Sequence, residues 1–155
     1  MRLIPAFTAA CLAVLATSGW AATMDASGTG HGTSMSTPMP VSDGVVMINA
    51  QTMYEGFDGD GPLANAKGPC FGGILIDKGA VSGHGLCHYT VESGDVAMIR
   101  WVAEGVTADG RTTGTWTVLG GSGAWDGATG GGAFNAGTDA AGAYTNMVTG
   151  EITMP

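Results

Sequence analysis

Most of this sequence has few of the residues that normally cover the surfaces of helices. Beyond residue 22 it holds only four leucines and two lysines, and charged residues make up 12% of the chain, against roughly 25% in ordinary globular proteins. This shortage argues against a helical protein. The 28 glycines have no three-residue period, which excludes collagen. A hydrophobic content of 45% excludes a disordered acidic chain.

Long hydrophobic runs are also absent, except at the N-terminus. There, Met1-Arg2 is followed by an apolar stretch from Leu3 to Ala16 and by small residues up to Ala22. This order predicts a signal peptide over residues 1–22, cut after Ala21 or Ala22. The apolar stretch is too short for a membrane anchor. We therefore expect an exported protein, in a periplasm or outside the cell, with no membrane span once the signal is removed.

Basic residues are scarce as well. After residue 22 the chain has thirteen acidic residues and only four basic ones, so its net charge there is −9. The basic residues are Lys67, Lys78, Arg100 and Arg111. Proteins that bind nucleic acids neutralise phosphates with clustered lysine and arginine. The composition therefore excludes nucleic acid as an expected partner.

Residues 23–43 are rich in glycine, serine, threonine, methionine and proline, and contain no aromatic residue. Such a composition predicts a flexible tail. The segment also holds Met24, His31, Met35 and Met39. Thioether and imidazole groups are ligands that suit copper. A copper site on this tail is therefore one hypothesis, and a linker without a metal is the other.

From Gly44 onward, runs rich in strand-forming residues are separated by glycine-containing turns. Strands are predicted over residues 45–54, 70–76, 81–90, 95–104, 111–119, 129–138 and 143–154, with a loop over 57–69. The connections leave no room for crossover helices, so neighbouring strands should be antiparallel. We predict one domain over residues 44–155, an all-β closed up-and-down barrel of about eight strands. A β-sandwich is the alternative.

The two cysteines beyond the N-terminal segment lie on a predicted hairpin. With Lys78-Gly79 as a two-residue turn, Cys70 and Cys87 face each other as a pair without backbone hydrogen bonds. Cβ atoms approach most closely at such pairs, which suits a disulfide in an exported protein. A redox-active pair is the alternative, although the C-x-x-C spacing is absent.

Strand alternation then indicates which residues face the interior. The same hairpin register pairs Gly72 with Gly85, which leaves a gap for either a neighbouring aromatic ring or a ligand. Tyrosines and tryptophans from other strands face the same interior, without any aspartate, glutamate, histidine or lysine. We therefore predict no catalytic residue and no cofactor. The predicted ligand-binding residues are Tyr54, Gly72, Gly85, Tyr89, Trp101, Trp116 and Tyr144.

Residues 114–132 read GTWTVLGGSGAWDGATGGG. This order of glycines, a small hydroxyl residue and an aromatic resembles the signature of the allene oxide cyclase and dirigent barrels. The matching residues are Gly120, Gly121, Ser122, Gly123, Trp125, Gly127, Ala128 and Gly130. The resemblance implies that the segment joins two strands of an eight-stranded antiparallel barrel, which can enclose a hydrophobic cavity. The catalytic residues of that superfamily lie outside the motif, so none is transferred to this chain.

Three functions remain open at this point. The first is a binding module whose partner is a small hydrophobic molecule held inside the barrel. The second is an isomerase or cyclase of the allene oxide cyclase type that shapes a substrate by confinement. The third is a structural or interaction protein whose barrel is filled by its own side chains. A charged group inside the barrel would favour the second function, and a solid interior the third.

Overall fold

The computed structural model describes residues 21–139 and 141–155, which form ten strands and one short 3-10 helix. The signal peptide predicted for residues 1–22 lies almost wholly outside these described residues. No helix in the described part of the chain is long and apolar enough to cross a membrane. The elements are β1 (Ala22–Asp25), β2 (Gly28–Ser34), β3 (Thr37–Ser42), β4 (Val45–Phe57), β5 (Gly68–Asp77), β6 (Ala80–Thr90), β7 (Val96–Val106), β8 (Thr112–Gly121), η1 (Gly123–Trp125), β9 (Thr129–Thr138) and β10 (Tyr144–Met154).

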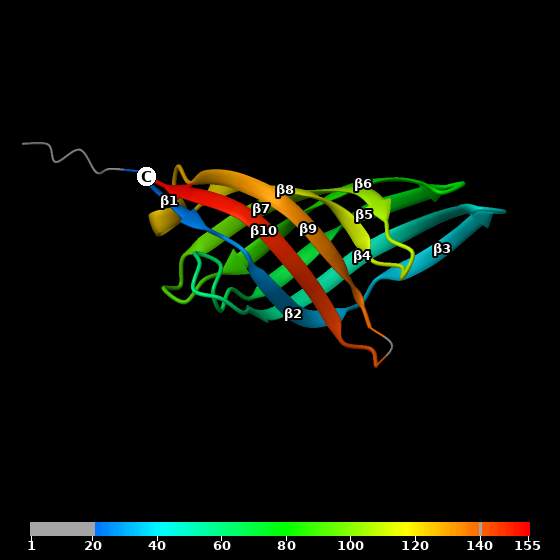
Figure 1. Ribbon diagram of the computed structural model, residues 1–155, viewed down its shortest axis with the longest axis horizontal. Helices are drawn as coiled ribbons and strands as arrows, with labels where there is room; N and C mark the ends of the chain where they lie inside the picture. The colour runs from blue at the N-terminus through cyan, green and yellow to red at the C-terminus, as the bar shows by residue number, and fades with distance from the viewer. Residues whose placement is uncertain (1–20, 140) are drawn as a thin grey trace, which may run out of the picture.

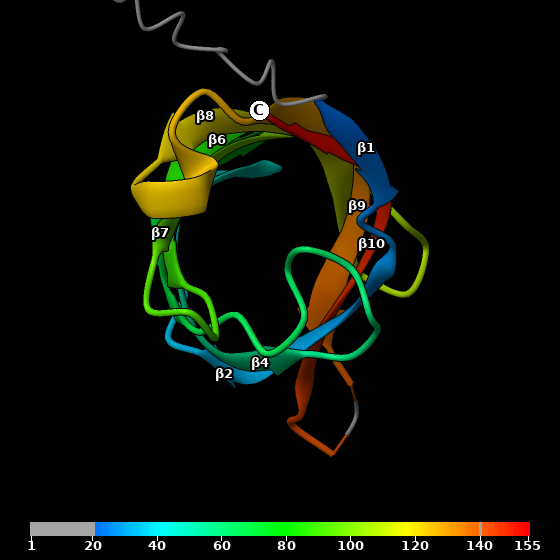
Figure 2. The same cartoon turned by 90° about the vertical axis from the view of Figure 1, so that its left-hand side faces the viewer.

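Eight of the strands close into an antiparallel barrel (Figures 1 and 2). Strands β4 to β9 each pair with the next strand along the chain. Strand β2 then closes the ring, because it pairs with β10 on one side and with β4 on the other. The predicted up-and-down barrel is therefore confirmed, and the alternative of a β-sandwich is wrong.

The expectation of a flexible tail over residues 23–43 is not what the structure shows. Residues in this range form β1, β2 and β3, and β2 is one of the eight barrel strands. Strands β1 and β2 lie in succession along β10, while β2 and β3 lie in succession along β4. The barrel therefore begins well before Gly44, because the last gap in the sheet is closed by the N-terminal segment.

The cysteine hairpin has the register expected from its two-residue turn. Cys70 pairs with Cys87 and Gly72 with Gly85, and Lys78-Gly79 forms the turn between β5 and β6. The Cα atoms of the two cysteines are 4.0 Å apart, and their sulfur atoms are bonded. The predicted disulfide is confirmed.

One end of the barrel is closed. The β4–β5 loop (residues 58–67) and η1 lie across this end (Figure 2). They contribute Leu63 and Trp125, which are 5% and 2% exposed. Strand β1 pairs with the end of β10, with Ala22 opposite Met154, so the first described strand and the C-terminus lie side by side here.

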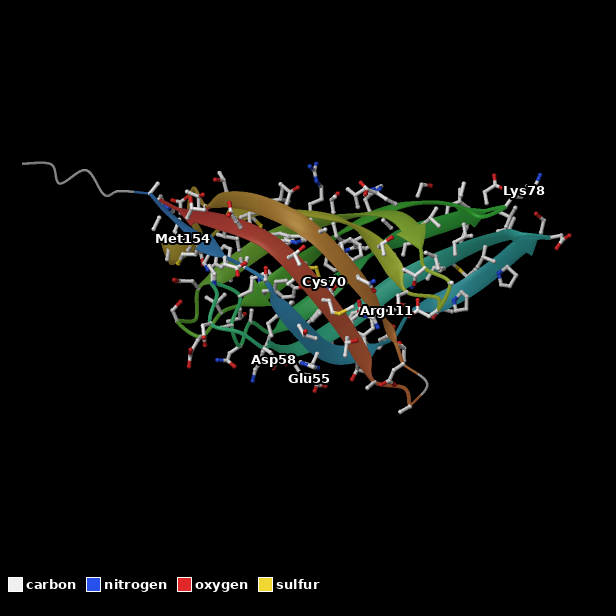
Figure 3. The ribbon with its side chains drawn as sticks, in the orientation of Figure 1. Glu55, Asp58, Cys70, Lys78, Arg111 and Met154 are labelled. Carbon is white, nitrogen blue, oxygen red and sulfur yellow. A yellow bond between two sulfur atoms is a disulfide. The ribbon has the colours of Figure 1, made fainter. Side chains whose placement is uncertain are left out.

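The other end of the barrel carries a projecting sheet. The β3–β4 and β5–β6 hairpins extend past the remaining strands, with Lys78 at one tip and Met154 at the far end of the molecule (Figure 3). Among the described strands, β3 pairs only with β4, so its other edge has no partner there. That strand contains Pro38 and Pro40. Proline lacks an N–H group and so reduces the capacity of a free edge to pair with another strand.

Candidate functional site

The barrel encloses a cavity of about 350 Å³. It opens at the end that carries the projecting sheet, where Ser36, Gly110 and Thr138 are exposed at its rim. The cavity is lined mainly by apolar and aromatic side chains of the barrel strands, and its volume falls in the usual range for small-molecule sites. The interior is therefore not filled by the protein's own side chains, which argues against the third function. The principal wall residues are Ile48, Ala50, Ile74, Ile99, Trp101, Trp116, Phe134, Ala136 and Val148.

Trp116 forms part of the cavity wall and is held in place by hydrogen bonds. Its indole Nε1 donates to the backbone oxygens of Ala133 and Thr149, both at 3.2 Å. These oxygens belong to β9 and β10, so the ring is anchored to the next two strands along the barrel wall. Trp116 is 5% exposed and lines the cavity.

Trp101 also lines the cavity, but the facing glycines do not. Its ring lies against the backbone of Gly72 and Gly85, and a Cβ atom at either position would overlap it. The gap predicted between the two glycines is therefore filled by an aromatic ring of the protein itself. Gly72 and Gly85 are absent from the residues that line the cavity. The structure thus places them behind the cavity wall, which corrects their expected place as ligand contacts.

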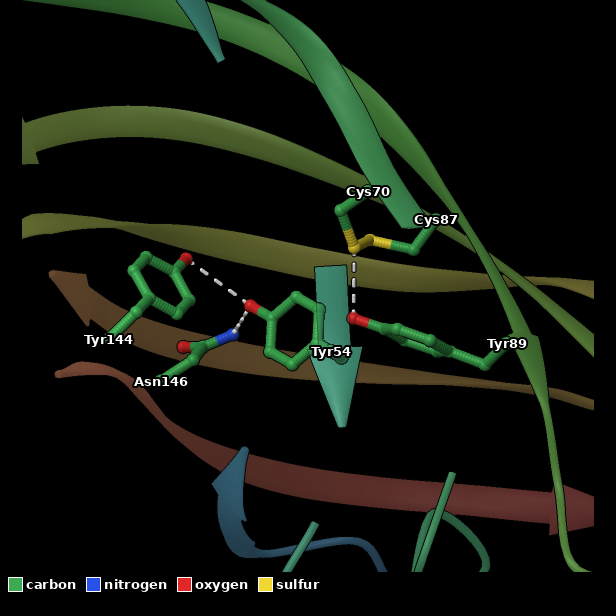
Figure 4. Close-up of a disulfide and its surroundings, with 6 residues drawn as sticks. All are labelled: Tyr54, Cys70, Cys87, Tyr89, Tyr144 and Asn146. Atoms are coloured by element: carbon green, nitrogen blue, oxygen red, sulfur yellow. Dashed lines mark hydrogen bonds between the residues drawn. A yellow bond between two sulfur atoms is a disulfide. The ribbon is translucent and has the colours of Figure 1, made fainter. Parts of the chain in front are cut away.

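The three tyrosines predicted inside the barrel meet at the inner part of the cavity (Figure 4). The ring of Tyr54 stacks on Phe57 at 5.1 Å and meets Tyr89 and Tyr144 edge-on at 5.4 and 5.7 Å. The Tyr89 hydroxyl donates a hydrogen bond to Sγ of Cys70 at 2.9 Å. The disulfide therefore fixes one end of this aromatic cluster.

Asn146 completes the cluster and was missed by the sequence analysis. Its Nδ2 donates to the Tyr54 hydroxyl at 2.9 Å, and that hydroxyl lies 3.3 Å from the Tyr144 hydroxyl. Asn146 is 8% exposed, and its Oδ1 finds no hydrogen-bond donor among the described residues. A signal existed, because residue 146 has the same strand parity as Tyr144, which was assigned to the interior.

The cavity is electrically neutral at ordinary pH. The described residues that line it include no aspartate, glutamate, histidine, lysine or arginine. Burial raises the pKa of Tyr54 and of Tyr89 well above the usual value for tyrosine, and mutual repulsion with neighbouring tyrosines adds to this effect. Both phenols therefore stay protonated and act as hydrogen-bonding groups rather than as general bases.

The residues suggested for copper do not form a cluster. Met24 lies on β1 near the closed end, and Met39 lies on β3 in the projecting sheet. At about 3.3 Å per residue of extended chain, their separation is tens of ångströms. His31 is instead 2.7 Å from an oxygen of Asp58, and Met35 follows β2. Within residues 21–139 and 141–155, no group of three histidine, cysteine, aspartate or glutamate side chains is arranged to hold a metal.

The glycine-rich segment 114–132 joins β8 to β9 through η1, as the resemblance implied. Trp125 is 2% exposed and closes the core beneath this turn. At Gly123 the backbone has a φ of 57°, and a Cβ atom there would overlap the Asp95 carboxylate. That carboxylate accepts a hydrogen bond from the backbone N–H of Ala124 at 3.2 Å. Glycine is therefore required at this position of the turn.

No family model and no curated protein matches the sequence. Among solved structures, a pterocarpan synthase dirigent protein is similar with a TM-score of 0.56 and 9% sequence identity. The similarity covers 86% of this chain and 91% of the dirigent protein. The chain therefore has a dirigent-like barrel fold.

Proposed function

We propose that this protein is an exported binding module that holds one small, mainly hydrophobic molecule inside its barrel. The observation that carries the proposal is the open cavity of about 350 Å³, walled by Trp101, Trp116 and aliphatic side chains. An apolar cavity with a few fixed polar groups is the common form of a small-molecule site.

The charge distribution supports a neutral ligand. The protein is acidic overall, whereas the cavity lining, over the part of the chain that the structure describes, holds no charged side chain that would pair with an ionic group. Transfer of an unpaired charge into such a site is costly. An apolar neutral guest instead gains free energy as its surface leaves water.

A dye titration tests this function. N-phenyl-1-naphthylamine, a neutral apolar dye, should bind saturably, gain fluorescence and quench the tryptophans that line the cavity. Ala50→Phe places a ring in the cavity and should reduce the affinity at least tenfold. Asn49→Phe is the matched control, because residue 49 is the exposed neighbour on the same strand. Equal binding by both variants would contradict the proposed site, provided that both keep the wild-type circular dichroism spectrum.

A second function, in which the cavity shapes a substrate during an isomerisation or cyclisation, is favoured by one observation. Tyr54, Tyr144 and Asn146 form a fixed hydrogen-bonding group inside an otherwise apolar cavity. Such a group orients a bound molecule and polarises one of its bonds. The test is to incubate extracts of the native host with the protein and with Tyr144→Phe. A product formed only with the wild-type protein would support catalysis, and unchanged extracts would leave binding as the function.

Export is part of the proposal. The Cys70–Cys87 disulfide is of the kind that forms in oxidising compartments. Strand β1 begins at Ala22, so cleavage after Ala21 would keep the whole strand paired with β10. The mass of protein recovered from the periplasm or medium should correspond to a chain that begins at Ala22 or Thr23. An intact N-terminus would contradict a cleaved signal.

A further inference from the structure

Of the three tyrosines that line the cavity, Tyr144 is the most accessible. Tyr54 and Tyr89 are 3% and 4% exposed, whereas Tyr144 is half-buried. Tyr144 is the first residue of β10 and lies opposite Thr138 of β9, a residue of the cavity rim. This side chain is therefore placed to contact a molecule that enters through the open end.

The hydrogen bonds behind Tyr144 determine what its hydroxyl offers to such a molecule. Asn146 Nδ2 donates to the Tyr54 oxygen at 2.9 Å (Figure 4). The Tyr54 proton then needs an acceptor, and the other partner of this hydroxyl among the described residues is the Tyr144 oxygen at 3.3 Å. Because the Tyr144 oxygen accepts this bond, the Tyr144 proton is free to be donated to a different partner.

The orientation of the Asn146 amide supports this order of donors. In the reverse orientation, its NH2 group would lie where Oδ1 now lies, enclosed and with no acceptor among the described residues. Buried N–H groups without a partner are rarer than oxygens without one. The series of donors therefore runs from Asn146 through Tyr54 to Tyr144.

Resting on the proposed binding function, we propose that the Tyr144 hydroxyl donates a hydrogen bond to a carbonyl oxygen of the bound molecule. The ligand class is a neutral ketone, aldehyde or ester with an apolar body. Its carbonyl group lies beside Tyr144, and its apolar part contacts Trp101, Trp116 and the aliphatic side chains of the wall.

A carbonyl oxygen fits this hydroxyl better than two other kinds of oxygen do. It needs one donor and has no proton of its own to place. An alcohol also needs an acceptor for its proton, and Asn146 Oδ1 is too enclosed to serve. A carboxylate would accept from Tyr144, but it would bring a negative charge into a cavity whose described lining holds no cation.

Two probes of nearly the same shape test this inference. They are 2-acetylnaphthalene and 2-isopropenylnaphthalene, in which a CH2 group replaces the carbonyl oxygen. Their affinities are measured by displacement of N-phenyl-1-naphthylamine. Tyr144→Phe should weaken binding of the ketone about fivefold, because it removes one hydrogen bond, and should leave binding of the hydrocarbon nearly unchanged.

The outcomes separate this inference from the proposed function. The same change for both probes, or no change for either, would overturn the role of Tyr144 while leaving the binding function in place. Saturable binding of neither probe to the wild-type protein would overturn both. Thr149→Val is the control, because it removes a hydroxyl from the exposed outer face of the same strand. This variant should keep the wild-type affinities.

Infrared spectroscopy gives a second readout that does not depend on affinity. The carbonyl stretch of bound 2-acetylnaphthalene should lie at a lower frequency in the wild-type complex than in hexane, and Tyr144→Phe should abolish this shift. A shift that persists in the folded variant would overturn the inference. A wild-type frequency equal to that in hexane would also overturn it, even if Tyr144→Phe fails to fold.

Discussion

The indole of Trp101 lies so close to Gly72 that a Cβ atom at residue 72 would be 2.5 Å from its Cζ2 atom. The same Cβ would overlap the backbone oxygen of His84 across the hairpin. Gly72→Ala should therefore lower the free energy of unfolding by about 1–3 kcal/mol, as overpacking usually does. Urea unfolding of the oxidised protein measures this change.

The next residue on the same strand provides the control. A Cβ atom at Gly73 would have the Ile48 oxygen, at 3.9 Å, as its nearest neighbour. Gly73→Ala should be neutral or raise the free energy of unfolding by up to about 1 kcal/mol, because the unfolded chain loses freedom. Equal destabilisation by the two changes would contradict the packing of Trp101 described here.

The disulfide is expected to stabilise the barrel mainly by restricting the unfolded chain. Replacing both Cys70 and Cys87 by alanine should lower the free energy of unfolding by about 3 kcal/mol, given the 17-residue separation. Urea unfolding of oxidised wild type and of the double variant gives the difference. Thiol labelling of the native, unreduced protein should detect neither cysteine. Full labelling of both would show that the bond is absent.

The buried tyrosines predict a loss of stability in alkali. Because the pKa values of Tyr54 and Tyr89 are raised in the folded state, the unfolded chain releases these protons first as the pH passes about 10. The free energy of unfolding should then fall by about 1.4 kcal/mol per pH unit for each such tyrosine. Below pH 9 their contribution should be constant. Tyr89→Phe should make the decline between pH 10 and 11 shallower, and an unchanged slope in urea unfolding would refute this assignment.

Arg111 lies just before β8 and connects this part of the chain to β9 and β10. Its Nη2 donates to the backbone oxygens of Asn135 and Thr145 at 2.8 and 3.1 Å, and its Nε contacts Asn135 Oδ1. Lysine cannot make this set of planar contacts. Arg111→Lys should therefore cost about 1–2 kcal/mol, measured by urea unfolding. Arg100→Lys, on the exposed outer wall, should change little. Equal losses of stability in the two variants would argue against these hydrogen bonds of Arg111.

The hairpin around Lys78-Gly79 was predictable because a two-residue turn fixes the register of both strands. Strands β2 and β3 were not predictable from the sequence, and the reason is local. In β2 the buried position is Gly30, where a Cβ atom would lie 2.6 Å from a ring atom of Phe57. Aromatic rings from β4 occupy the interior space that side chains of β2 would otherwise fill. Strand β2 therefore lacks the alternation of apolar and polar side chains by which a strand is recognised in a sequence. Strand β3 was obscured by Pro38 and Pro40, which an edge strand tolerates.

The aromatic lining of the cavity followed from strand alternation, which placed Tyr54, Trp101 and Trp116 inside. The position of the empty space did not follow, because it depends on the direction of one side chain. Trp101 turns toward Gly72 and Gly85 and fills the gap between them. Space is therefore left farther along the barrel, beside Ala50 and Ala136. Alternation predicts which face a residue occupies but not where its ring lies.

The pairing of Ala22 with Met154 places both ends of the described chain at the same end of the barrel. Anything joined to either end of the described chain is attached beside the closed end (Figure 1). The rim of the cavity lies at the opposite end of the barrel. Immobilisation through either terminus would therefore present every cavity to the solution. The same proximity suits circular permutation, with a short peptide joining residues 154 and 22 and new ends opened at the Lys78-Gly79 turn.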